Sequence, residues 1–257
     1  MLVAGCATAP LPPRQIDDPA TLPRHTLALS WAGRFAQQSY HRAGEGIAYI
    51  PGKELLTYAI TDRLEWHFVG VLRYALLDEQ PLVQRPPDRL SLTVEGGVIG
   101  LGVVDGFLLA VPMARIAGRK RLSRWCALQS SLQALGHLEG GWQGGEYFAD
   151  AGPLFQLTRG VAVALQASAV VAAGRFDASY DLRLAPRRDV TQLGPSLALS
   201  LRPWPWIEVW VTAGALRSRQ VIDSRDYVQR GPSETIGLPP RTVGWDLRLD
   251  VAGVVRL

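Results

Sequence analysis

No stretch of this chain reaches the ~18 uninterrupted apolar residues that a transmembrane helix needs. Charge is also scarce, since 19% of the residues are charged and 47% are apolar, a low charge content for a soluble protein. If the chain spans a membrane, it must therefore form a closed β-barrel, because only helices and closed barrels satisfy the backbone in lipid.

Cysteine is scarce, and a concentrated positive charge is missing. The two cysteines, Cys6 and Cys126, stand far apart and neither has the spacing of a metal ligand, so we expect no metal site and no cofactor. The formal net charge is +4 and the sequence pI about 9.3, but the arginines are spread along the chain. Without a basic stripe, a nucleic-acid partner is not expected.

A strict alternation of apolar and polar residues is present instead, most clearly in residues 243–257. Val243, Trp245, Leu247 and their successors at odd positions form one set, and the even positions carry most of the charge. A period of two over this length predicts one long strand, apolar on one face and charged on the other. Soluble strands usually run about five or six residues, whereas strands of roughly ten residues suit a transmembrane barrel.

The same alternation recurs along the chain, and from residue 161 to 173 the even set is mostly small or polar, as a narrow barrel interior requires. We therefore predict an all-β fold, an antiparallel up-and-down transmembrane β-barrel, preceded by a tether over residues 1–24 and formed by residues 25–257. The predicted strands are 26–36, 46–60, 62–77, 89–117, 121–136, 147–158, 160–173, 191–203, 205–217 and 241–257.

Ten strands are the preferred count and twelve the alternative. The segment 89–117 is too long for one strand, and Asp105-Gly106 is a hairpin signal inside it. A split there gives eleven, so a twelfth strand would have to be found elsewhere. Pro51 also indicates a bulge or loop in the second strand. The connections are expected to alternate long and short, as in outer-membrane barrels with longer outer loops and short periplasmic turns.

Inward-facing charges and interface tryptophans are the candidate site residues. Buried charges must pair or stay hydrated, so the inner set predicts either an interlocking network, which we prefer, or a thin wet path. The expected lumen-facing residues are Arg34, Arg63, Glu65, Arg73, Arg202, Glu208, Asp246, Arg248, Asp250 and Arg256. The expected aromatic girdle, where amphipathic rings prefer the membrane interface, consists of Trp66, Trp125, Trp204 and Trp206.

The N-terminal residues Leu2-Val3-Ala4-Gly5-Cys6 resemble a bacterial lipobox, followed by a Pro-rich stretch. The resemblance implies lipidation at Cys6 and an anchor on the periplasmic side of the outer membrane. It lacks the charged and apolar regions that should come first, so we expect the true start to lie upstream. One acyl chain anchors weakly, so firm attachment needs further acylation or an adjoining barrel.

Residues 58–65 resemble a segment common in proteobacterial outer-membrane barrels, in which a strand enters a Thr-Asp turn and leaves through Arg-Leu-Glu. The last strand resembles the assembly signal of these proteins, although it ends in Leu257 rather than an aromatic residue. These resemblances imply Gram-negative outer-membrane β-barrel proteins, with outer-membrane lipid and the barrel assembly machinery as partners. They do not set an oligomeric state.

No catalytic residue is predicted. Of the four histidines, only His67 lies on an expected inner face, beside Glu65, and a lumen-filling role suits it better than that of a base without a positioned partner. The serines lack a nucleophile-elbow context. A structural, assembly or narrow-channel barrel is thus the preferred function. The alternatives are a lipid-modifying barrel hydrolase or acyltransferase, and a soluble periplasmic lipoprotein barrel with large aliphatic residues inside that binds an apolar ligand.

Overall fold

The computed structural model describes residues 21–37, 46–48, 56–68, 70–77, 90–104, 107–123, 125–139, 142–158, 160–176, 187–204, 206–222 and 241–257. Within these ranges every regular element is a β-strand, and none is a helix long and apolar enough to cross a membrane. The strands are β1 (Leu27–Gln37), β2 (Gly46–Ala48), β3 (Leu56–Ala59), β4 (Leu64–His67), β5 (Val71–Leu77), β6 (Leu90–Val104), β7 (Phe107–Arg121), β8 (Cys126–Glu139), β9 (Trp142–Thr158), β10 (Val161–Phe176), β11 (Arg187–Trp204), β12 (Ile207–Ile222) and β13 (Arg241–Arg256).

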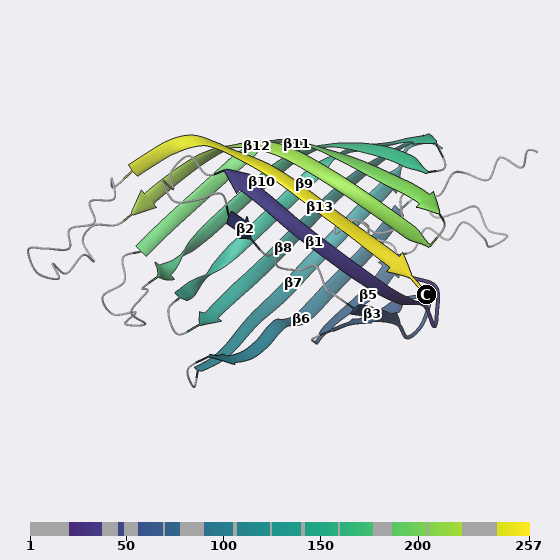
Figure 1. Ribbon diagram of the computed structural model, residues 1–257, viewed down its shortest axis with the longest axis horizontal. Helices are drawn as coiled ribbons and strands as arrows, with labels where there is room; N and C mark the ends of the chain where they lie inside the picture. Colours follow the sequence, from purple (N-terminus) through teal and green to yellow (C-terminus); the bar gives the residue numbers. More distant parts are fainter. Residues whose placement is uncertain are drawn as a thin grey trace, which may run out of the picture.

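The strands close into one antiparallel barrel. Neighbours in the sequence pair in order from β3 to β13, and β13 returns to β1 along ten residue pairs, from Ala28 opposite Arg256 to Gln37 opposite Leu247. Figure 1 shows β13 lying beside β1 at this closure. Both β2 and β3 pair with β1, at different heights, so the thirteen strands fill twelve positions around the ring. The prediction of an all-β antiparallel barrel is confirmed.

The preferred count of ten strands is wrong, and the alternative of twelve is right. Two predicted strands are hairpins: 89–117 divides into β6 and β7, and 62–77 divides into β4 and β5. In the second hairpin His67 pairs with Val71, so the loop between them has three residues. A three-residue loop leaves odd positions facing inward on both strands, and the alternation therefore passes through the turn unbroken. Pro51 lies outside the described residues, between β2 and β3.

The expected alternation of long and short connections is also wrong. We call the end where β1 begins and β13 finishes the terminal end, and the opposite one the far end. The longer connection 78–89 joins β5 to β6 at the terminal end, together with the turns 60–63 and 122–125. The expected long loop 137–146 is mostly strand, because β8 runs to Glu139 and β9 begins at Trp142.

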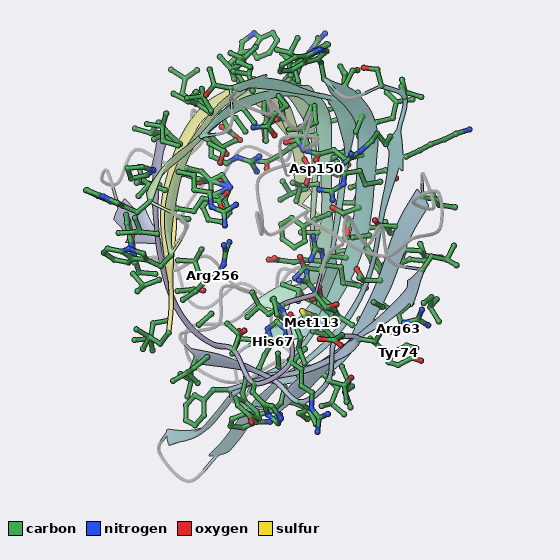
Figure 2. All side chains as sticks on the ribbon, turned by 90° about the vertical axis from the view of Figure 1, so that its right-hand side faces the viewer. Arg63, His67, Tyr74, Met113, Asp150 and Arg256 are labelled. Carbon is green, nitrogen blue, oxygen red and sulfur yellow. The ribbon has the colours of Figure 1, made fainter. Side chains whose placement is uncertain are left out.

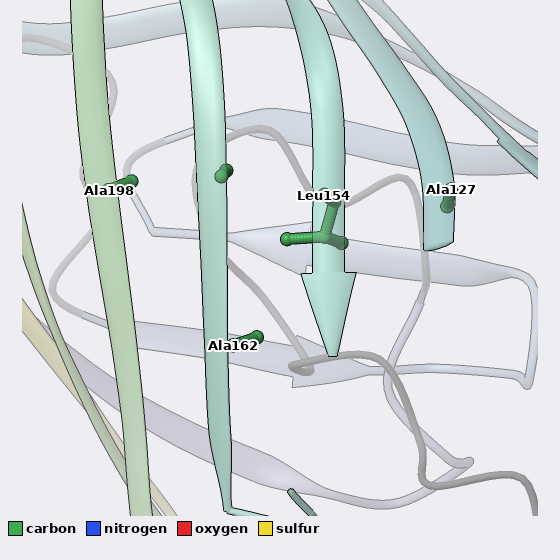
Figure 3. Packing of buried hydrophobic residues seen from close by; sticks show 5 residues of the cluster. Ala127, Leu154, Ala162 and Ala198 are labelled. Atoms are coloured by element: carbon green, nitrogen blue, oxygen red, sulfur yellow. The ribbon is translucent and has the colours of Figure 1, made fainter. Parts of the chain in front are cut away.

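Burial alternates along the strands and places the small and polar set inside. In β10 the even positions Ala162, Ala164 and Ser168 are buried, whereas Leu165 is 49% exposed. A cluster of four alanines and Leu154, from β8 to β11, forms part of the inner face (Figure 3). The apolar outer face is broad, and Leu193 reaches 61% exposure. This is the reverse of the soluble ligand-binding barrel, which requires large aliphatic residues inside.

Part of the β6–β7 hairpin extends past its neighbours. The β5–β6 ladder ends at Val71 opposite Gly97, and the β7–β8 ladder begins at Met113 opposite Leu135. Beyond these points the described segments of β6 and β7 form their ladder with each other, and Val98 N–H still donates to the Gly70 carbonyl at 3.4 Å. The hairpin projects from the ring in Figures 1 and 2. Gly97 has φ +151°, a conformation that favours glycine, at the point where β6 leaves β5.

Candidate functional site in the barrel lumen

The structure places most of the expected lumen charges on the inner face. Glu65, Arg73, Glu208 and Asp246 are buried. Partial burial is found for Arg202, Arg248, Asp250 and Arg256. Figure 2 looks along the barrel and shows Arg256 and His67 pointing into it. The side chain of Arg34 lies outside the described part, although its backbone pairs with Asp250 across β1 and β13.

The prediction that Arg63 faces the lumen is wrong, because its side chain is exposed and points away from the interior (Figure 2). It belongs to the turn between β3 and β4, where the Thr61 hydroxyl accepts hydrogen bonds from the backbone N–H groups of Arg63 and Leu64. The two-residue alternation holds only along a strand. It does not extend back through the turn, and Glu65 is the first charged inner residue of β4.

The β4–β7 side of the lumen holds a buried ion cluster, which we define as Glu65, His67, Arg73, Glu95 and Arg115. The guanidinium of Arg73 lies 2.5 Å from Glu95 and 3.9 Å from Glu65. Arg115 Nη1 donates to the same Glu95 oxygen at 2.8 Å. The side chains of Arg73, Glu95 and Arg115, which lie on three adjacent strands, are at most 5% exposed. Direct pairing is therefore what allows the charges to remain inside the wall.

Sequence reasoning missed Glu95 and Arg115. They lie in the segment 89–117, which the ten-strand count predicts as one strand, and they are opposite each other in the β6–β7 ladder. Arg73 is in turn opposite Glu95 in the β5–β6 ladder. The hairpin signal Asp105-Gly106 lies almost midway between positions 95 and 115. Folding the segment at that signal would have paired the two charges.

This face also carries a chain of contacts from a hydroxyl to an imidazole to a carboxylate. Thr57 Oγ1 is 3.4 Å from His67 Nδ1, and His67 Nε2 is 3.2 Å from Glu65 Oε2. The order resembles nucleophile, base and orienting acid. However, Thr57, His67 and Glu65 are 1%, 2% and 0% exposed, so a substrate could not reach the hydroxyl. The arrangement fits polar filling of the lumen better than lipid hydrolysis.

The β9–β13 side carries buried serines and acids together with several charges that are partly exposed to solvent. Glu208 accepts a hydrogen bond from Ser200 at 2.8 Å and pairs with Arg256 at 3.2 Å. Arg248 and Asp250 lie 3.6 Å apart, each with 13% side-chain exposure. Further polar contacts on this side join Gln192 to Asp246, and Ser168 to Asp150 and Ser196. On this side Glu208 and Asp246 are buried, whereas Arg202, Arg248, Asp250 and Arg256 are partly open to solvent.

The tryptophans of the expected girdle lie on the outside of the wall. Trp125, Trp204 and Trp206 are about half exposed and lie in or beside turns of the terminal end. The rings of Trp204 and Trp206 stack with centroids 5.7 Å apart. Trp66 is partly buried on β4 and meets Phe68 edge-on at 6.1 Å, near the β4–β5 hairpin. Trp66 itself follows the terminal turn 60–63 by three residues and pairs with Tyr58, which is opposite Leu27 at the start of β1.

Other candidate chemistry is limited in the described ranges. They contain no group of three His, Cys, Asp or Glu residues that could hold a metal ion. Cys126 is a half-buried free thiol at the start of β8. Cys6 lies outside the described residues.

No protein-family model and no curated protein matches the chain. Its fold is similar to solved outer-membrane proteins. An outer membrane channel from Pseudomonas putida F1 shares 12% identity over 94% of this chain and 100% of the other, with a TM-score of 0.42. OmpT of Vibrio cholerae shares 8% identity over 96% and 100%, with a TM-score of 0.38. Ail of Yersinia pestis shares 10% over 92% and 100%, with a TM-score of 0.29. These values are too low to transfer a function.

Proposed function

We propose that this protein is a Gram-negative outer-membrane β-barrel whose partly hydrated lumen passes small ions or solutes. The partly open charges on the inner face of β11–β13 carry the proposal. A lumen serving only as structural filling would bury all such charges, as the ion cluster does on the opposite side. Twelve strands also fall between eight-stranded barrels, which side chains can fill, and porins of 16–18 strands with wide aqueous channels.

The outer surface supports the membrane setting. The exposed Leu247 and Leu249 and the partly exposed Val251 on β13 lie between Trp245 near the far end and Trp206, whose carbonyl accepts a hydrogen bond from the backbone N–H of Arg256. Trp245 and Arg256 are eleven residues apart on one strand. At about 3.3 Å per residue and a tilt of about 40°, they span a height of ~28 Å. Barrels of the outer membrane carry an apolar band of about 25 Å.

Charge at the inward-facing positions that the structure describes is mixed along the barrel axis. Counting from the strand ends, five arginines and four acids lie nearer the terminal end: Arg115, Arg119, Arg121, Arg202 and Arg256 against Glu65, Glu95, Glu208 and Asp250. Arg73, Arg248, Glu146 and Asp246 lie nearer the opposite ends of their strands, and Asp150 is at the midpoint of β9. Mixed charge of both signs favours weak ion selectivity.

Its partners would be outer-membrane lipid and, during biogenesis, the barrel assembly machinery; we propose no nucleic-acid partner. The first test is expression in a Gram-negative host from an upstream start, followed by membrane separation. We expect recovery from the outer membrane and faster gel migration before boiling than after it, because a closed barrel stays folded in detergent. Recovery in the soluble fraction, without a migration shift, would contradict the membrane setting.

A charge reversal in the lumen should change ion selectivity. The interaction energy between a unit charge and an ion about 4 Å away in water is about 1 kcal/mol, and Arg256→Glu changes the charge at this position by two units. We therefore expect cation permeability relative to anions to rise several-fold, measured as the reversal potential of the purified protein in planar bilayers under a salt gradient. Arg63→Glu, on the outer side of the wall, is the matched control and should leave the ratio unchanged. Equal ratios in both variants, or no current at all, would refute the channel.

We further propose a lipid anchor at Cys6 on the periplasmic side. Cys6→Ser should abolish incorporation of radiolabelled palmitate in cells while leaving heat-modifiable migration intact, because a closed barrel holds itself in the membrane without an acyl chain. Cys126→Ser is the control and should keep the label. Label that persists in Cys6→Ser would contradict the anchor and leave the barrel proposal standing.

A further inference from the structure

Residues 21–26, which we call the N-terminal clasp, lie at the terminal end of the barrel before β1 begins, and of these six residues Leu22 is the buried one. Leu22 is 3% exposed and packs against Ala28, Ala59 and Val254. These three residues belong to β1, β3 and β13, which are neighbours in the ring. All three are buried at inward-facing positions close to the terminal end. Together they form an apolar socket for one leucine in a lumen that is otherwise largely polar.

Polar contacts hold the clasp on both sides of Leu22. The backbone N–H of Leu22 donates to the carboxylate of Glu65, the buried inner residue of β4. The backbone N–H of Arg24 donates to Asp62 Oδ1 at 2.8 Å, and the Thr21 hydroxyl donates to the Asp62 carbonyl at 2.6 Å. Asp62 lies in the turn between β3 and β4. The clasp is thus joined both to the terminal rim and to the lumen.

The backbone conformation of the clasp returns the chain toward the barrel. His25 has φ +61°, in the left-handed region, and its N–H donates to the Ala59 carbonyl at 2.8 Å. The His25 ring lies 2.9 Å from the Tyr58 hydroxyl, measured from Nδ1. A non-glycine residue rarely adopts this conformation unless surrounding contacts hold it there. These contacts bind the clasp to the barrel. Residues 21–24, which the sequence predicts to belong to the tether over residues 1–24, are therefore part of the folded barrel.

We propose that the N-terminal clasp is a built-in closure of the terminal mouth, with Leu22 as its anchor and Glu65 as its receptor. The occupant of the mouth is therefore the chain itself. Glu65 also contacts His67 and Arg73, so release of the clasp removes a donor from the buried ion cluster. Opening of the mouth and rearrangement of the cluster are coupled through this carboxylate. The closure of an ion path rests on the proposed channel function, whereas the seating of the clasp does not.

Seating is tested by cysteine labelling of the full-length protein in detergent, with Cys6 and Cys126 replaced by serine. Leu22→Cys should react with a hydrophilic maleimide at least about tenfold more slowly than Arg24→Cys, because a buried site must open before it can react. Arg24 is an exposed neighbour whose clasp contact uses only the backbone. Equal rates would overturn the proposal, whether or not the barrel conducts.

Closure is tested by conductance in planar bilayers. Leu22→Asp puts a carboxylate into the apolar socket beside Glu65 and should raise single-channel conductance about twofold or more by unseating the clasp. Arg24→Ala keeps the backbone contact and should conduct like the unaltered protein; heat-modifiable migration checks that both variants fold. Unchanged current in Leu22→Asp, with a conducting parent protein, would overturn closure. No current in any variant, with Leu22→Cys protected, would instead refute the channel and retain the seated clasp.

Discussion

Replacing Glu95 with alanine is expected to lower the free energy of unfolding by about 3–5 kcal/mol, the usual cost of removing one partner from a buried ion pair. Glu95 contacts both Arg73 and Arg115, whose side chains are 4% and 3% exposed. Without it, two guanidinium groups remain inside the wall with only Glu65, 3.9 Å from Arg73, as a nearby anion of the cluster. Denaturant unfolding of the refolded barrel, followed by tryptophan fluorescence, gives the measurement.

Two further variants separate charge from packing. Asp250→Ala removes the partner of Arg248 at a site where both side chains are 13% exposed, so water can solvate the remaining charge. We expect it to cost at most about 1 kcal/mol. The triple change Arg73→Met, Glu95→Leu and Arg115→Met removes the three directly paired charges, leaves Glu65 in contact with His67 and the Leu22 N–H, and should recover most of the loss. A loss below about 1 kcal/mol in Glu95→Ala would show that the cluster does not govern stability.

The alternation of residue types was sufficient to predict the barrel, because one face of each long strand must meet lipid and the other the lumen. It was insufficient for the strand count. Odd-numbered residues face inward both before and after the loop between His67 and Val71, so the alternation of residue types does not reveal the turn. Arg63 shows the opposite failure, since a regular pattern was carried into a turn where side chains no longer alternate.

The candidate site was predictable only in part for a related reason. Periodicity says that Glu65 and Arg73 share a face, but not which residue lies beside them on the next strand. That information is in the register, and the β6–β7 register depends on where the hairpin folds. The N-terminal clasp left no signal at all. Its position depends on contacts between Leu22 and residues on three strands, including Val254 at the other end of the chain.

Two glycine–proline steps in the wall, Gly152-Pro153 in β9 and Gly194-Pro195 in β11, mark places where neighbouring backbones approach closely. At both, the proline lacks an N–H for the ladder, and paired positions are missing from the registers with β10 and β12. A Cβ added at Gly152 would come far closer than 3.0 Å to the carbonyl oxygen of Leu165, and one at Gly194 would do the same to Ala215. Neither contact could be relieved by turning a side chain, because the obstacle is backbone.

Gly152→Ala should therefore lower the free energy of unfolding by about 3 kcal/mol, at the upper end of the usual cost of overpacking. Gly194→Ala should behave alike, because the same geometry recurs two strands away. The matched control is Gly118→Ala in β7, where the new Cβ would be 3.6 Å from Leu92 and 3.7 Å from the Ser91 carbonyl, ordinary contact distances. Denaturant midpoints of the three refolded variants give the comparison. If Gly152→Ala were as stable as Gly118→Ala, the strands would have to separate at this step without loss, and the close approach would not be a constraint on the wall.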